Sequence, residues 1–192
     1  MTCVRRASAL CFVFLATALA QTPAELMDDP AVRAAFDAIQ RNEASVIQQQ
    51  IQVCEIPAPP FHEEMRGQDV KRRFEQLGLH DVRIDRVGNV IGVRPGKAAH
   101  PNLVFSAHLD TVFPEGTDVK VRVDGDILKA PGIGDDCRGL ALMLGVIRAL
   151  DEAHVETPGT ITFVAGQNYT LVVAPAASGS TTLRTFLVTG CA

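Results

Sequence analysis

The sequence predicts an α/β fold with a mostly parallel sheet. Two short apolar runs, Asn102–Ala107 and Thr160–Ala165, are typical of strands that are buried on both faces of a sheet. Segments with helical character, Glu63–Leu77 and Cys137–Asp151, alternate with these runs along the chain. Because strands that alternate with helices pack into layers around one core, and 192 residues suffice for one such core, we expect a single α/β domain.

Three helices are expected before the first strand. Pro30–Gln40 begins with an aspartate as N-cap and a proline at the first helical position. Glu43–Cys54 ends before the proline-rich segment Ile56–Pro60, because prolines cannot continue a helix. The third helix, Glu63–Leu77, ends where Gly78 provides a C-terminal stop signal.

Two hairpins are expected between these helices and the helix that begins at Cys137. The first joins Val82–Arg86 to Asn89–Val93 through a turn that contains a Gly-Asn pair. The second joins Val119–Val123 to Asp126–Lys129 around an Asp-Gly pair, which is a strong hairpin signal.

The first twenty residues have the composition of a secretory signal peptide. Two arginines precede the apolar run Ala7–Ala16, and the small residues Ala18 and Ala20 form a cleavage site. The apolar run is shorter than the roughly 20 residues that span a bilayer. We therefore expect cleavage after Ala20, a secreted or periplasmic protein and no stable membrane span; the alternative is a retained N-terminal anchor.

Composition excludes several classes of function. The net charge is −4, and the chain has nine Phe, one Tyr and no Trp, so neither a basic surface nor a stacking platform for nucleic acid is indicated. A complete phosphate loop, a complete dinucleotide fingerprint and a Gly-x-Ser-x-Gly nucleophile motif are all absent from the sequence.

Three cysteines remain after removal of the signal: Cys54, Cys137 and Cys191. They form no Cys-x-x-Cys pair, so neither a zinc knuckle nor a thioredoxin-like redox site is encoded. Cys54 and Cys137 are interpreted as buried small hydrophobic residues, and one disulfide stays open as the alternative.

Acidic and imidazole side chains follow the first buried strand. His108 and Asp110 share one face of an extended chain, at the strand end where α/β sheets place their ligands. Asp135 and Asp136 stand where the glycine-rich loop Ala130–Gly139 enters a helix, and a carboxylate at such a position can bridge two cations. Together, in this order and spacing, these residues predict a metal centre.

The pair of motifs resembles the co-catalytic zinc exopeptidase family, which includes peptidase T-like tripeptidases, carboxypeptidases and aminoacylase-like deacylases. Glu55–Glu63 and Gly88–Ile91 also look like leading segments of that family. The resemblance implies a zinc-exopeptidase-like α/β/α sandwich, C-terminally truncated, in a secreted zinc-dependent exopeptidase or amidohydrolase. It implies a short peptide or N-acyl amino acid as substrate.

The same resemblance assigns roles to three residues. It implies that His108 is a ligand of one zinc ion and that Asp135 bridges both. It implies that Asp110 is the catalytic acid that orients its neighbours without binding metal. It also implies a cis peptide bond between Asp135 and Asp136.

The sequence departs from the family after Thr160–Ala165. There the family has a Gly-Glu-Glu-Gly segment, whose first Glu is the general base and whose second Glu binds metal. Here Gly166 is followed by Gln and Asn, and residues 167–192 contain no Asp, Glu, His or Lys. We therefore expect residues 21–166 to be the N-terminal part of a metallopeptidase catalytic domain.

Residues 167–192 are expected to be an atypical tail that arises from a frameshift or truncation. A chain without the general base and the later metal ligands is expected to be inactive alone. The alternative is a non-catalytic truncated remnant or a binding module. The lid or dimerisation domain of the family is also missing, which leaves the oligomeric state open.

Overall fold

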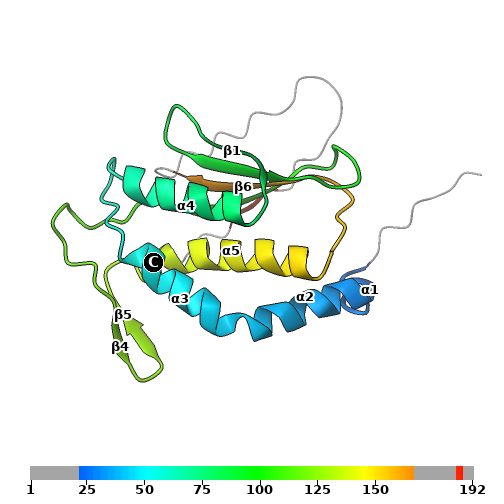
Figure 1. Cartoon of the computed structure of the whole chain (residues 1–192), viewed down its shortest axis with the longest axis horizontal. Helices are drawn as coiled ribbons and strands as arrows, with labels where there is room; N and C mark the ends of the chain where they lie inside the picture. The colour runs from blue at the N-terminus through cyan, green and yellow to red at the C-terminus, as the bar shows by residue number, and fades with distance from the viewer. Residues whose placement is uncertain (1–21, 167–184, 188–192) are drawn as a thin grey trace, which may run out of the picture.

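The structure is a computed structural model that describes residues 22–166 and 185–187 (Figure 1). The expected signal peptide, residues 1–20, and all of the tail except residues 185–187 lie outside the described residues. The helices are α1 (Pro23–Met27), α2 (Pro30–Arg41), α3 (Glu43–Cys54), α4 (Glu64–Gln76) and α5 (Cys137–Glu152). The strands are β1 (His80–Ile84), β2 (Val90–Arg94), β3 (Leu103–His108), β4 (Arg122–Asp124), β5 (Ile127–Lys129), β6 (Ile161–Gly166) and β7 (Thr185–Leu187).

The main sheet has the strand order β1-β2-β6-β3-β7 and confirms the α/β class. β6 lies between β2 and β3; it runs antiparallel to β2 and parallel to β3. The parallel pairings expected from the buried runs occur around β3, whereas β1 and β2 pair antiparallel because a short turn joins them. The sheet is therefore mixed rather than parallel throughout.

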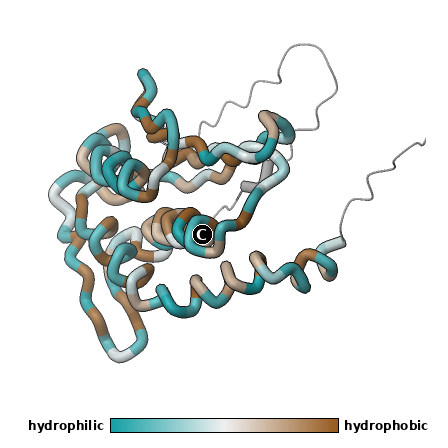
Figure 2. Tube along the Cα trace, turned by 45° about the vertical axis from the view of Figure 1, so that its right-hand side comes forward, coloured by the Kyte–Doolittle hydropathy of each residue, from teal (hydrophilic) through white to brown (hydrophobic). Residues whose placement is uncertain are grey.

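Helices cover one face of this sheet in the part of the chain that the structure describes (Figure 1). α4 packs on β1 and β2, α5 packs on β3, and α2 and α3 pack against α5. The core comprises apolar residues from the sheet and from these helices, with Phe74, Phe163, Leu140, Met143 and Leu144 among its fully buried side chains. Figure 2 shows the corresponding contrast between the largely hydrophobic α5 and the mostly hydrophilic α4.

β3 differs from the expectation that it is buried on both faces. Ala107 is buried, but the other residues of the strand are half-buried. The described helices lie against only one side of the sheet, which explains this difference. None of the helices in the described ranges has the length and apolarity needed to cross a bilayer.

Local signals account for most of the element boundaries. Asp29 caps α2 by accepting hydrogen bonds from the amides of Ala31 and Val32, as its position before Pro30 suggests. α1 was not expected; it is a five-residue helix that is closed by a capping box between Thr22 and Glu25.

The hairpins are shorter or shifted relative to the expectation. β1 begins at His80 and ends at Ile84, because the Asp85 carboxylate closes the turn. Its Oδ1 atom accepts from the amides of Val87 (3.0 Å) and Asn89 (2.9 Å). The hairpin β4–β5 projects from the body of the molecule (Figure 1), and its strands have three residues each.

A buried arginine joins three segments of the chain. Arg66 in α4 is fully buried. Its guanidinium donates to the carbonyl oxygens of Ile56 (2.6 and 3.1 Å), Leu109 (2.7 Å) and Cys54 (3.4 Å). Because the guanidinium is planar with five donors, it can satisfy carbonyls on both sides at once. Arg66 thus ties the end of α3 to the residue that follows β3.

Replacing Arg66 by Ala is expected to lower the free energy of unfolding by roughly 4 kcal/mol, because several buried carbonyls lose their donor. Urea denaturation measures this change through the midpoint at constant slope. Arg72→Ala is the matched control on the same helix; Arg72 is exposed and pairs with Asp69, so its loss costs less than about 0.5 kcal/mol. Equal losses in the two variants would contradict the role given to Arg66.

Stability should also depend on the ionisation of Asp85. Burial raises the pKa of this carboxyl, but hydrogen bonds from Asn89 and Val87 and the charge of Arg83 outweigh burial and lower the pKa. The pKa of Asp85 in the folded state lies below its value of about 3.9 in the unfolded state. The ionised carboxylate therefore contributes its full stabilisation at pH values above about 3.9. The contribution is lost as the pH falls through the folded pKa.

Urea midpoints of the wild type and Asp85→Asn, measured at several pH values, test this dependence. Asn keeps an oxygen acceptor for the turn but does not titrate. The stability difference between the two proteins is expected to shrink as the pH falls below about 4. A difference that stays constant with pH would be inconsistent with this assignment.

Candidate metal centre

The candidate site lies at the C-terminal end of β3. His108 is the last residue of β3 and is paired in register with Gly166, the last residue of β6. The amide of Leu109 donates to the carbonyl oxygen of Gly166 at 2.7 Å, which continues the pairing beyond the strand. The C-terminal ends of β3 and β6 therefore lie at the same edge of the sheet.

Two carboxylates hold the imidazole of His108 from opposite sides. Its Nε2 atom lies 2.7 Å from Asp135 Oδ1, and its Nδ1 atom lies 3.1 Å from Asp110 Oδ1. The Asp110 side chain is 4% exposed, whereas that of Asp135 is 43% exposed. The expected proximity of His108 and Asp135 is confirmed; their assignment as metal ligands, and that of Asp110 as catalytic acid, stay predictions.

Asp136 connects the strand to the following helix. Its Oδ2 atom accepts from the amide of His108 (2.9 Å), and its Oδ1 atom accepts from the amide of Gly139 (2.9 Å) as the N-cap of α5. A Cβ at Gly139 would lie 2.0 Å from that Oδ1 atom, so this close approach requires glycine. The peptide bond between Asp135 and Asp136 is cis, as expected.

The environment of the clustered side chains shifts the pKa values of His108 and Asp136. Burial lowers the pKa of His108, but the hydrogen bond to Asp135 and the charges of Asp136, Asp110 and Asp135 outweigh burial and raise it. Burial raises the pKa of Asp136, and the hydrogen bonds from His108 and Gly139 only partly oppose this effect. The site therefore favours positive charge on or beside the imidazole.

Helix α3 supports the loop that carries these aspartates. Gln50, which is 6% exposed, donates from Nε2 to the carbonyl of Ile133 (2.8 Å) and accepts at Oε1 from Arg138 Nη1 (3.1 Å). The Cys54 thiol donates to the carbonyl of Pro131 at 3.5 Å. Sequence reasoning missed these contacts, because they join residues that are 77 to 88 positions apart.

The donor chemistry fits part of a zinc site. Nitrogen from imidazole and oxygen from carboxylate are both common zinc ligands. The hydrogen bond between Nδ1 and Asp110 leaves Nε2 as the atom of His108 that faces Asp135, as in a carboxylate–histidine–metal arrangement. Within residues 22–166, however, the structure groups no three His, Cys, Asp or Glu side chains in a way that could hold a metal.

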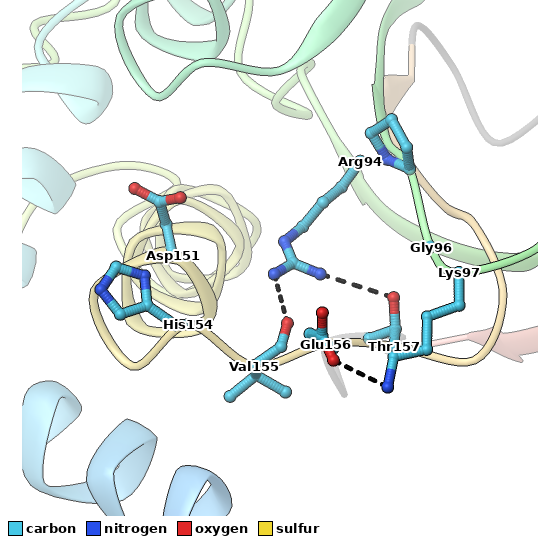
Figure 3. Close-up of a pocket in the computed structure, with 9 residues that line it drawn as sticks. Arg94, Gly96, Lys97, Asp151, His154, Val155, Glu156 and Thr157 are labelled. Atoms are coloured by element: carbon cyan, nitrogen blue, oxygen red, sulfur yellow. Dashed lines mark hydrogen bonds and ion pairs between the residues drawn. The ribbon is translucent and has the colours of Figure 1, made fainter.

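A separate pocket of about 370 Å³ lies at the opposite end of the sheet (Figure 3). It lies beside Arg94, whose partner in register is the first residue of β6. Three of its charged groups are engaged locally: Lys97 pairs with Glu156 at 2.7 Å, and Arg94 donates to Thr157 Oγ1 at 3.4 Å. This pocket therefore does not take part in the site around His108.

Known proteins are similar to this chain in both sequence and fold. The profile of peptidase family M28 matches residues 89–168. The uncharacterized protein YqjE of Bacillus subtilis is 32% identical over 64% of this chain and 36% of its own length. Carboxypeptidase G2 of a Pseudomonas species is 34% identical over 50% of this chain and 25% of its own length. The crystal structure of a Staphylococcus aureus tripeptidase superimposes with a TM-score of 0.55 and 27% identity, over 65% of this chain and 36% of that one.

The described part of the chain has an α/β fold similar to that of the tripeptidase. In sequence, the chain is similar to peptidase family M28 and to a carboxypeptidase, and in fold it is similar to a tripeptidase. The chain spans about a quarter to a third of the length of the curated relatives it matches.

Substituting Asp136 by Ala is expected to destabilise the chain by about 2–3 kcal/mol, because the N-cap of α5 and the acceptor for the part-buried amide of His108 are lost together. Asp135→Ala is the matched control; its carboxylate is more exposed and its contact is with the His108 ring. Thermal or urea unfolding of both variants compares the two losses. An Asp136→Ala variant no less stable than Asp135→Ala would contradict this prediction.

Proposed function

We propose that this chain is the N-terminal part of an exported zinc-dependent exopeptidase or amidohydrolase. The proposal rests mainly on the contact of 2.7 Å between His108 Nε2 and Asp135 Oδ1, with Asp110 at the other ring nitrogen, Nδ1. Relationship to zinc exopeptidases supports the reaction class. The substrate class that we propose is a short peptide or an N-acyl amino acid, in line with relatives named as a carboxypeptidase and a tripeptidase.

The proposed roles follow from the contacts of each residue. His108 and Asp135 would hold zinc, and Asp110 would fix the ring so that Nε2 faces the metal. Asp136 holds the backbone of His108 and the start of α5 in place. Zinc, when bound, polarises the scissile carbonyl and lowers the pKa of its water.

We also propose that the 192-residue chain does not hydrolyse peptides by itself. Catalytic zinc sites use three or more protein ligands together with a group that accepts a proton from water. His108 and Asp135 supply two ligands, and the sequence after β6 supplies no carboxylate. Export of the chain rests on the signal-like composition of residues 1–20.

Zinc is expected to raise the unfolding temperature of the full chain modestly, because a two-ligand site binds it weakly. The increase should disappear in His108→Ala and in Asp135→Ala. The matched control is Asp118→Ala in an exposed loop, which should retain it. Differential scanning fluorimetry at several zinc concentrations gives the comparison, and chromatographic assays of di- and tripeptides are expected to show only background hydrolysis.

Two outcomes would overturn the proposal in different ways. Zinc-dependent peptide hydrolysis by this chain would show that its own residues supply the remaining metal ligands and the general base, and the proposed inactivity would be wrong. If zinc does not change the unfolding temperature, or changes it equally in the wild type and in His108→Ala, the assignment of a metal centre is wrong. That second result would favour a non-catalytic remnant or binding module, for which the acid-free sequence after β6 is the specific observation.

A further inference from the structure

A groove of about 320 Å³ lies on the helical side of the molecule, where the junction of α2 and α3 meets α5. Figure 1 shows α2 and α3 on the side of α5 that faces away from the sheet. The walls of the groove are apolar and come from all three helices: Ile39 from α2, Val46 from α3, and Leu142 and Val146 from α5. The groove is therefore an apolar surface that is separate from the edge of the sheet where His108 lies.

Large apolar side chains at this groove are exposed to solvent. Ile39 and Leu142 are each 40% exposed, and Phe36 is 49% exposed. Phe36 lies three residues before Ile39, so the two side chains are neighbours on one face of α2. Exposed apolar residues that are scattered singly need no explanation, but a group of them beside an apolar groove is typical of a protein–protein contact.

Opposite charges stand at the two ends of the groove. α3 and α5 run antiparallel: Gln50, near the end of α3, accepts from Arg138 in the first turn of α5 at 3.1 Å. Asn42, which precedes α3, donates to Glu152 at the end of α5 at 3.0 Å. Arg138 therefore lies at one end of the groove, and Glu43, which follows Asn42, lies at the other.

Neither of these two charges is neutralised within the part of the chain that the structure describes. Arg138 contacts the uncharged amide of Gln50, and no ion pair of Arg138 or of Glu43 occurs among residues 22–166. Glu43 is exposed in the first turn of α3, and Arg138 is exposed as well. Each end of the groove thus offers an unpaired charge to another molecule.

We propose that a second copy of this chain covers the groove and that the two copies form a dimer with two-fold symmetry. A two-fold axis across the groove places the copies antiparallel, so Arg138 of each chain meets the partner's Glu43. The exposed Phe36 and Ile39 of each chain then pack over the apolar walls of the other groove. Both charges gain a partner, and the apolar side chains leave water together.

The arrangement of the surface favours a second copy over a different protein. A two-fold interface requires a surface that is complementary to itself. A different partner would have to supply an anion for Arg138, a cation for Glu43 and apolar side chains between them. This chain already carries all three on one surface and in that order.

A dimer of this kind would also act on the candidate metal centre. Gln50, which accepts from Arg138, donates through Nε2 to the carbonyl oxygen of Ile133 at 2.8 Å. Ile133 belongs to the loop that carries Asp135. When the partner's Glu43 holds Arg138, the contact between Gln50 and this loop is held as well.

Sedimentation velocity of the full chain over a range of concentrations, in dithiothreitol to exclude disulfide-linked dimers, measures the association. The wild type is expected to form dimers. Arg138→Glu faces the partner's Glu43 with a second anion, and Glu43→Arg faces the partner's Arg138 with a second cation. Each variant alone is therefore expected to associate at least about tenfold more weakly than the wild type.

An equimolar mixture of the two charge variants makes the test specific. In a mixed dimer, each charge again meets one of opposite sign, so the mixture is expected to associate as the wild type does. A variant that had lost its fold could not be rescued in this way. Leu142→Asp is expected to weaken association, whereas Val123→Asp, at a 65% exposed residue of the hairpin β4–β5, is the matched control and should not.

Three results would overturn the proposal. A wild type that stays monomeric at every concentration would leave the groove to a different protein. Charge variants that associate as strongly as the wild type, or a mixture that associates no more strongly than either variant alone, would place the contact elsewhere on the chain. All of these readouts are independent of zinc, peptide hydrolysis and export.

Discussion

The hydrogen bonds of the Arg66 guanidinium are the contacts on which the arrangement of the site depends. A charged side chain is costly to bury, and here three backbone carbonyls from two segments compensate for the loss of water. One segment is the end of α3 and its following turn, and the other begins directly after β3. Arg66 therefore fixes the distance between the helix that supports the aspartate loop and the strand that carries His108.

The site itself is a junction of backbone and side-chain contacts rather than a preformed cavity. Asp136 joins the amide of His108 to the first turn of α5, and Gln50 joins the same loop to α3. In one orientation of its ring, His108 contacts Asp110 through Nδ1 and Asp135 through Nε2. Rigid neighbours of this kind are what hold a metal ligand in a single geometry.

Local patterns in the sequence predicted the parts of the structure that local physics decides. Proline and aspartate at Asp29–Pro30 set the start of α2, and the apolar runs gave β3 and β6 within one residue at each end. His108, Asp110 and Asp135 stood out because each follows a strand or precedes a helix at a distinctive spacing. The strand pattern placed His108 and Asp110 on one face, whereas the proximity of Asp135 was implied by the resemblance to zinc exopeptidases.

Contacts between distant segments could not be predicted in the same way. In the sequence, Arg66 is one of several charged residues of a hydrophilic helix. Its neighbours in sequence do not indicate that it donates to carbonyl oxygens 10 and 43 residues away. The end of β1 was misplaced because the Asp85 turn, not the apolar pattern, ends that strand. The sequence placed Asp136 where the loop enters a helix, but it did not identify Asp136 as the helix cap, and the bond of Asp136 to the His108 amide depends on tertiary structure.

The position of β6 has a consequence for how the protein is made. This strand is central in the sheet, between β2 and β3, yet it is synthesised after both of them. Until residues 161–166 leave the ribosome, the β1–β2 hairpin and β3 have no strand to join them, and non-local pairing of this kind forms slowly. The two halves of the sheet therefore stay unconnected in the nascent chain until β6 has been synthesised, so the sheet forms late rather than strand by strand.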